Sequence, residues 1–246
     1  MQPSKEWFSE WFDSPYYHIL YKNRDMREAE FFLRNLVRRL AFTPQQELVD
    51  LACGKGRHSI FLNSLGFHVT GVDLAAHSIA AAKFFENDRL HFEVQDLRNL
   101  PYQNRFDVAL NLFTSFGYFD CDNTNQTVIK QIYQSLKPGG TLVIDFMNVA
   151  CVLSKLVHEE TKEIDGITFH ITKKVVDDVI VKRIEFTDKG KSYTFSEEVQ
   201  ILALDDFKRL FDCGGFELKA TYGNYKLEPF DVNSSDRLIL VATKHA

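Results

Sequence analysis

The stretch that decides the fold is E-L-V-D-L-A-C-G-K-G-R-H-S, residues 47–59. It begins as a short apolar run, continues into a loop that contains Gly54 and Gly56, and ends in residues that can start a helix. A parallel strand that delivers a ligand onto a glycine loop has this form. The two glycines let the backbone approach the ligand closely because they carry no Cβ atom.

Asp50 places a carboxylate just before this turn. The carboxylate would repel a pyrophosphate, whereas it would attract a cationic amino group. The series Gly54-x-Gly56-x-x-Ser59 nearly fits the dinucleotide pattern, with Ser59 in place of the third glycine or alanine. A nicotinamide-dependent oxidoreductase is therefore an alternative, although Asp50 argues against it.

Bulk composition favours a folded protein without a nucleic-acid partner. The chain has 246 residues, of which 45% are hydrophobic and 13% aromatic, and its net charge is −5. A nucleic-acid binder usually carries a basic excess. The sequence begins without a signal-peptide core, and no apolar run reaches the roughly 18 residues that span a bilayer. We therefore expect a cytoplasmic protein that does not bind membranes.

Metal and disulfide sites are not expected either. The four cysteines are scattered and form no C-x-x-C pair: Cys53, Cys121, Cys151 and Cys213. No group of His, Asp and Glu has the spacing of metal ligands, so we predict no metal.

Strands and helices alternate after a helical start at residues 5–42. This alternation predicts a parallel sheet with helices on both faces. The expected strands are 47–52, 68–72, 90–94, 107–112 and 141–146, and the expected helices are 57–65, 75–87 and 124–136. Antiparallel hairpins follow at 167–176, 179–187 and 193–203. A helix at 204–211 and strands at 216–222 and 237–243 close the chain.

An ordered series of motifs resembles the class I S-adenosylmethionine-dependent methyltransferases. After V-D-L-A-C-G-K-G-R-H-S come V-T-G-V-D-L-A (69–75), F-E-V-Q-D-L (92–97), F-D-V-A-L-N-L-F (106–113), L-K-P-G-G-T-L-V-I-D (136–145), G-F-E-L (215–218) and R-L-I-L-V-A-T-K (237–244). The resemblance implies an α/β, doubly wound, seven-stranded, mostly parallel Rossmann-like sheet. It also implies a helical lid at 1–42, a cofactor-binding core at 43–150 and 204–246, and an antiparallel β insertion at 160–203.

Flanking segments narrow this resemblance to small-molecule N-methyltransferases. Y-Y-H-I-L-Y (16–21), S-F-G-Y (115–118) and the late β insertion look similar to aminosugar N-methyltransferases and to relatives of the glycine N-methyltransferases. The fourth strand ends in Asn111-Leu112-Phe113-Thr114, without the proline pair of enzymes that methylate amino groups of nucleic-acid bases. The expected acceptor is therefore a small molecule, and the expected product of the cofactor is S-adenosylhomocysteine.

The resemblance also assigns residues to the cofactor. Asp73 is expected to accept hydrogen bonds from the ribose hydroxyls, Asp96 to meet the adenine, and Asp50 to hold the ammonium group directly or through a water. The full expected cofactor set is Tyr21, Asp50, Ala52, Cys53, Gly54, Gly56, Asp73, Leu74, Gln95, Asp96, Leu97, Asn111 and Phe113. The expected substrate pocket is Tyr16, Tyr17, His18, Thr114, Ser115 and Tyr118. Arg24 is a candidate partner for the cofactor carboxylate, or else a surface cation.

No catalytic residue is identified, because orientation alone can supply much of a methyl transfer and a base is needed only if the acceptor must lose a proton. His58 and His170 are candidate bases, although packing roles are the more common alternative. Other functions stay open: a methyltransferase that acts on protein or RNA, or a cofactor-binding protein without transfer activity. The insertion either covers the pocket or makes a dimer contact, so both a monomer and a homodimer are compatible.

Overall fold

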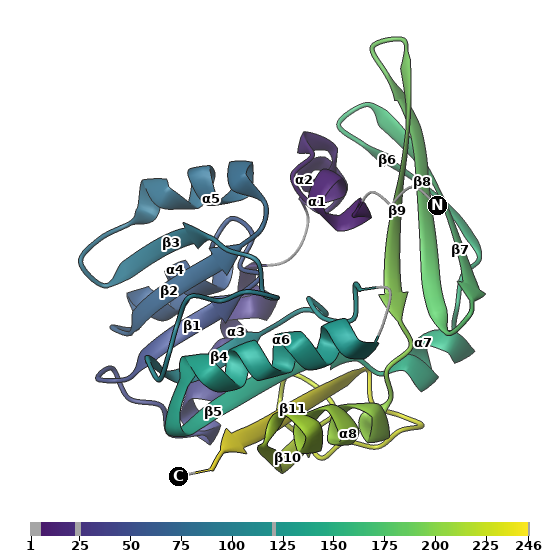
Figure 1. Ribbon diagram of the computed structural model, residues 1–246. Helices are drawn as coiled ribbons and strands as arrows, with labels where there is room; N and C mark the ends of the chain where they lie inside the picture. Colours follow the sequence, from purple (N-terminus) through teal and green to yellow (C-terminus); the bar gives the residue numbers. More distant parts are fainter. Residues whose placement is uncertain (1–5, 23–25, 120–121, 246) are drawn as a thin grey trace.

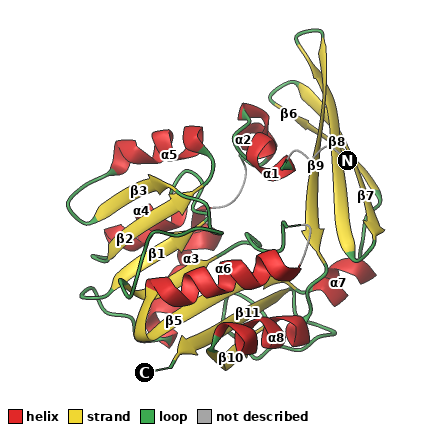
Figure 2. Ribbon diagram, in the orientation of Figure 1, coloured by secondary structure: helices red, strands yellow, loops and turns green. Residues whose placement is uncertain are grey.

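The computed structural model describes residues 6–22, 26–119 and 122–245. Its centre is a seven-stranded sheet with the order β10-β11-β5-β4-β1-β2-β3, shown in Figures 1 and 2. The strands are β1 (Glu47–Leu51), β2 (His68–Asp73), β3 (Leu90–Val94), β4 (Phe106–Asn111), β5 (Leu136–Met147), β10 (Phe216–Tyr222) and β11 (Arg237–Lys244). Strands β1 to β5 are parallel, whereas β10 and β11 pair in the antiparallel sense. The predicted fold class is confirmed.

Helices cover both faces of this sheet. One face packs against α3 (Met26–Arg39), α4 (Arg57–Ser64) and α5 (Ala76–Ala82), and α5 is followed by a short 3₁₀ turn, Lys83–Phe85. The other face packs against α6 (Asp122–Ser135) and α8 (Leu204–Gly214). The order of the strands reverses between β1 and β4, and ligands of such sheets bind at the carboxyl ends of the strands beside this reversal.

A second, four-stranded antiparallel sheet forms the insertion. It consists of β6 (Glu159–Ile164), β7 (Ile167–Val176), β8 (Val179–Asp188) and β9 (Lys191–Gln200), and helix α7 (Val149–Ser154) leads into it. The predicted hairpins are present. Strand β6, which was not expected from the sequence, pairs with β7 at one edge of this sheet, and its residues are mostly exposed.

The N-terminal helical region is divided between two parts of the molecule. Helices α1 (Trp7–Trp11) and α2 (Pro15–Leu20) lie between the large sheet and the insertion (Figure 1), whereas α3 packs beneath the large sheet. The buried side chains of Trp11 and Leu20 share a hydrophobic cluster with insertion residues Phe169, Ile184 and Phe186. We call α1, α2 and β6–β9 together the cap, because they have this core in common.

Residues 138–140, between the expected helix at 124–136 and the expected strand at 141–146, form a bulge within β5. Phe106 pairs with Leu136, but Val108 pairs with Thr141, so extra residues are accommodated on β5. Gly139 adopts a positive φ of 77° there, which glycine tolerates without steric cost.

Candidate functional site

A cavity of about 560 Å³ lies between the carboxyl ends of the parallel strands and the cap. Among the residues predicted for the cofactor, those that line it are Tyr21, Ala52, Cys53, Gly54, Asp73, Leu74, Gln95, Asp96, Leu97 and Phe113. Among those predicted for the substrate, Tyr17, His18, Thr114, Ser115 and Tyr118 line it. The structure thus brings most of the predicted site together at one edge of the sheet.

The glycine loop and the end of β2 form one unit. Backbone N–H of Gly54 donates to Asp73 Oδ2 at 2.7 Å, and N–H of Ala75 donates to Asp73 Oδ1 at 2.8 Å. Gly54 has a φ of 56°, and a Cβ built on it would meet no atom within 4 Å. The loop therefore presents bare backbone to the cavity. Burial raises the pKa of Asp73, although the backbone N–H groups act in the opposite direction.

Gly56 supports the loop from beneath instead of lining the cavity. Its φ is 80°, and an added Cβ would lie 2.5 Å from ring carbons of Phe92. Only glycine satisfies both the backbone conformation and this close approach. The residue is thus required for the shape of the loop, and its neighbours Lys55 and Arg57 line the cavity.

Asp50 lies behind the loop, not in the cavity. Its side chain is buried at 1% exposure and accepts a hydrogen bond from Ser59 Oγ at 2.6 Å. Burial raises its pKa to about 7, and the hydrogen bond from Ser59 opposes that rise. The structure therefore gives Asp50 no direct contact with the cavity, in contrast to the direct contact with an ammonium group considered from the sequence.

Asp96 is connected through Arg98 to Glu6, the residue before helix α1 of the cap. The Arg98 side chain donates to the carboxylate of Asp96, with Nε 2.9 Å from either oxygen, and it also pairs with Glu6 just before α1. Burial raises the pKa of Asp96, but the hydrogen bonds from Arg98 outweigh this effect and the net shift is downward. Asp96 is thus a carboxylate on the cavity wall, linked through Arg98 to Glu6, which precedes α1.

The loop after β4 is held in an unusual conformation. Phe113 and Thr114 have φ values of 59° and 60°, in the left-handed region that non-glycine residues rarely adopt. Phe113 N–H donates to Asp145 Oδ2 at 2.9 Å, and Thr114 N–H donates to the Asp145 carbonyl at 2.8 Å. Asn111 is buried beneath this loop, where its Nδ2 donates to the Ser115 carbonyl at 3.0 Å, so it does not line the cavity.

Arg237 completes the support of this loop. Its Nε donates to Asp145 Oδ1 at 2.8 Å, and its Nη2 donates to Thr114 Oγ1 at 3.0 Å. Neither Asp145 nor Arg237 was expected at the site from the sequence. The available signal was a charged residue at the end of a buried strand, but its partner lies far away along the chain on β11.

On the cap side, aromatic rings and one carboxylate face the cavity. Trp7, Phe12, Tyr17 and Tyr21 line it there, and Tyr118 packs against the rings of Trp7 and Phe12 from the loop after β4. Glu197 and Val199 come from β9, and the sequence analysis did not single out either of them. Strand alternation shows which face of β9 a residue occupies, but it does not show which face is turned toward a distant loop.

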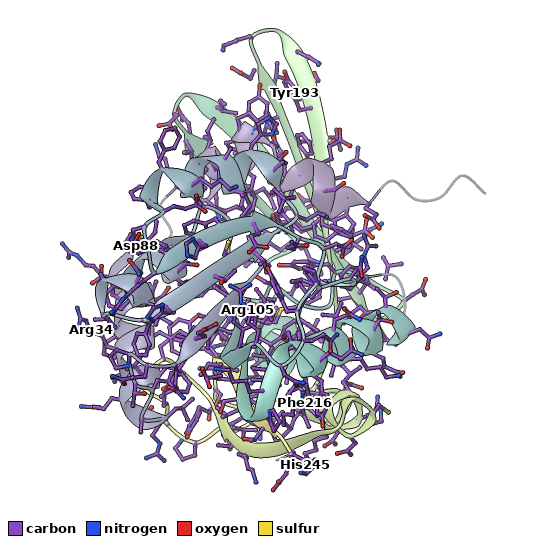
Figure 3. The ribbon with its side chains drawn as sticks, turned by 60° about the vertical axis from the view of Figure 1, so that its left-hand side comes forward. Arg34, Asp88, Arg105, Tyr193, Phe216 and His245 are labelled. Atoms are coloured by element: carbon purple, nitrogen blue, oxygen red, sulfur yellow. The ribbon has the colours of Figure 1, made fainter. Side chains whose placement is uncertain are left out.

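Tyr16 was expected in the substrate pocket but points into the insertion. Its hydroxyl donates to Asp188 Oδ2 at 2.9 Å, and its ring lies 4.6 Å from Phe186 and 4.7 Å from Tyr193. Figure 3 labels Tyr193, which lies toward the end of the β8–β9 hairpin. Neighbouring residues on a helix point in different directions, so Tyr17 lines the cavity and Tyr16 does not.

Of the two candidate bases, His58 lines the cavity and His170 does not. His58 lines the cavity and stacks on Phe113 with ring centroids 4.9 Å apart. His170 is exposed on β7 and does not line the cavity. Arg24 lies outside the described residues.

Within the residues that the structure describes, no three His, Cys, Asp or Glu side chains form a metal-binding group. None of the described helices is long and apolar enough to cross a membrane.

These features fit S-adenosylmethionine. A loop of exposed backbone beside a partly buried acid at the end of β2 suits a nucleoside with an amino-acid side chain. The loop admits close backbone contact, and the carboxylate of Asp73 has lone-pair positions left for hydroxyl donors.

Comparison with known proteins agrees with this fit. A family model described as a methyltransferase domain matches residues 43–202. A glycine/sarcosine N-methyltransferase of Aphanothece halophytica is 28% identical over 230 residues, which covers 90% of this chain and 83% of that protein. A putative methyltransferase of Bacillus subtilis is 35% identical over 101 residues, covering 40% of this chain and 41% of that protein.

Solved structures share the fold. An S-adenosylmethionine-dependent methyltransferase from Clostridium acetobutylicum superimposes with a TM-score of 0.79 at 18% identity, covering 94% of this chain and 96% of that one. An amino pentose methyltransferase from Micromonospora echinaspora gives a TM-score of 0.67 at 20% identity, covering 94% and 97%. Together with the family match and the glycine loop, these findings set the oxidoreductase alternative aside. The chain belongs to the methyltransferase-domain family and is a class I S-adenosylmethionine-dependent methyltransferase.

Proposed function

We propose that this protein methylates a small molecule enclosed between the glycine loop and the cap. The observation that carries the proposal is the cavity itself: about 560 Å³ in volume, lined by the strand ends on one side and by the cap on the other. Pockets for small ligands have volumes of about 300–1,000 Å³ and are mostly apolar with a few polar groups. A protein or an RNA acceptor would instead need an open groove across the site.

The shared core of the cap supports this proposal. Trp11 is fully buried between the lid helices and the insertion, so α1 and α2 are anchored to β7–β9 and not loosely attached. A cover that is anchored in this way excludes water from the reacting atoms and limits the size of the acceptor.

In this proposal the cofactor lies along the sheet edge, with the Gly54 loop at its amino-acid end, Asp73 at the ribose and Asp96 at the adenine. Bound S-adenosylmethionine supplies an electrophilic methyl group on a sulfonium centre. The residues of the protein orient the acceptor, exclude water and hold the loop at Phe113 in place. Orientation of this kind can contribute several kcal/mol to a rate.

The curated relatives named glycine/sarcosine N-methyltransferases support a small amine as the acceptor. The acidic net charge of −5 supports the absence of a nucleic-acid partner. We further propose a cytoplasmic location and a monomer or homodimer.

The test is transfer of a labelled methyl group from S-adenosylmethionine to three separate acceptor pools: small amines with amino acids and aminosugars, small hydroxyl compounds, and a mixture of protein and RNA. We expect label in a small-molecule pool alone. Label only in the protein and RNA pool would contradict the proposal. Binding of S-adenosylhomocysteine without transfer to any pool would favour a cofactor-binding protein without transfer activity.

A further inference from the structure

Glu197 differs from the other acids on the cavity wall. In the described part of the chain three acids line the cavity, and Asp73 and Asp96 belong to the sheet edge. Glu197 comes from β9 in the insertion, so it faces the cavity from the cap. Its side chain is 17% exposed, which leaves part of the carboxylate accessible.

Three donors hold this carboxylate in a fixed orientation. Trp11 Nε1 donates to Oε1 at 2.8 Å, and Tyr21 Oη donates to the same oxygen at 2.6 Å. Lys182 Nζ donates to Oε2 at 3.2 Å. A carboxylate has about four lone-pair positions, so these donors leave one position on Oε2.

Lys182 also balances the charge of Glu197. Its side chain is 14% exposed on β8, it does not line the cavity, and it donates a second hydrogen bond to Tyr21 Oη. An ammonium group in the acceptor would have to compete with this cation, and Lys22 and Arg57 add positive charge to the cavity wall. An uncharged N–H donor meets no such competition.

We propose that Glu197 binds the acceptor, accepting a hydrogen bond on Oε2 from the N–H of an uncharged primary or secondary amine. This inference rests on the proposed function, because it names the chemical group that the same cavity holds. A neutral amine that donates its N–H to Glu197 keeps its lone pair free to face the methyl group. The rings of Tyr17 and Tyr118 line the same cavity and pack against the carbon atoms of such an acceptor.

Adjacent residues on β9 provide a matched pair of variants. Glu197→Gln keeps the shape of the side chain but removes its charge, whereas Glu198→Gln makes the same change one residue away. Strand neighbours point to opposite faces, and Glu198 does not line the cavity. Tyr21→Phe removes only the hydroxyl that donates to Glu197, so it tests the same contact if the Glu197 variant fails to fold.

The experiment measures methylation of glycine, sarcosine and glucosamine, together with calorimetric binding of S-adenosylhomocysteine to each variant. For any of these amines that the wild type methylates, we expect Glu197→Gln to raise KM roughly 10- to 100-fold, as loss of a charge-assisted hydrogen bond predicts. Tyr21→Phe should raise KM by a smaller factor and Glu198→Gln by less than about twofold. The dissociation constant of S-adenosylhomocysteine should stay the same in Glu197→Gln and Glu198→Gln.

Several results would overturn the inference. Equal KM values for Glu197→Gln and Glu198→Gln would remove Glu197 from the acceptor site. Weaker binding of S-adenosylhomocysteine in parallel with the rise in KM would show a general structural effect. Methylation of hydroxyl compounds with all three amines inert would contradict the inference while leaving the proposed function intact. Failure of the wild type to bind S-adenosylhomocysteine would instead count against the proposed function.

Discussion

The substitution Asp145→Asn tests whether the loop at Phe113 depends on a buried carboxylate. Asp145 is fully buried. Its carboxylate accepts three hydrogen bonds, from Arg237 Nε at 2.8 Å, Phe113 N–H at 2.9 Å and Tyr225 Oη at 3.3 Å. Asparagine preserves the volume but replaces one acceptor oxygen by a donor. It also leaves the guanidinium of Arg237, whose side chain is 20% exposed, without its counter-charge.

The expected loss follows from these contacts. Removing one partner of a buried ion pair costs about 3–5 kcal/mol, because the other charge is left uncompensated. The carboxylate also helps to hold left-handed backbone at Phe113 and Thr114, where strain is of order 1–3 kcal/mol for each residue. We therefore expect the free energy of unfolding to fall by about 3–5 kcal/mol, which a domain of ordinary stability survives.

Urea unfolding followed by circular dichroism measures this loss. Tyr225→Phe is the control, because it removes only the 3.3 Å hydrogen bond and should cost at most about 1.5 kcal/mol. Binding of S-adenosylhomocysteine should weaken in Asp145→Asn and not in the control. A free energy of unfolding within about 1 kcal/mol of the wild type for Asp145→Asn would show that the loop does not depend on this carboxylate.

Three further predictions concern the glycine loop. Asp73→Ala should weaken binding of S-adenosylhomocysteine by about 1–3 kcal/mol through loss of the ribose contacts, and unchanged affinity in a folded variant would refute that role. Gly56→Ala should lower the free energy of unfolding by at least about 1–3 kcal/mol, because the added methyl group clashes with Phe92. Gly54→Ala should lower it by only about 1–2 kcal/mol, but it places a methyl group toward the cavity. Equal stabilities of the two variants in thermal unfolding would contradict this difference. The folded-state pKa of Asp50, about 7, lies above its unfolded value, so its contribution to stability is present below about pH 4 and is lost as the pH rises through about 7. The difference in free energy of unfolding between wild type and Asp50→Asn should fall over that interval, and a flat difference would contradict the burial of this carboxyl.

Local patterns were sufficient to predict the large sheet. The alternation of strands and helices, and the motifs at the end of each strand, locate Gly54, Asp73 and Asp96 because the carboxyl ends of neighbouring parallel strands meet at one edge. A single sequence is enough for this inference, because each motif marks the residue at which its strand ends.

Contacts between residues that lie far apart along the chain could not be predicted from the sequence. Asp145 and Arg237 meet across β5 and β11, and Glu197 reaches the cavity only because the insertion folds back over it. The direction in which a single side chain points could not be predicted either. Asp50 turns toward Ser59 behind the loop and Tyr16 turns toward Asp188, although Ala52 and Tyr17, close to them in the sequence, line the cavity.

We assign the edge of the sheet at Gly54, Asp73 and Asp96 to the cofactor of a methyltransferase. Calorimetric titration of the wild-type protein with S-adenosylhomocysteine, with NAD and NADP titrated in parallel, tests it most directly. We expect micromolar binding of S-adenosylhomocysteine and no binding of either nicotinamide cofactor. Binding of NAD or NADP without S-adenosylhomocysteine would contradict it.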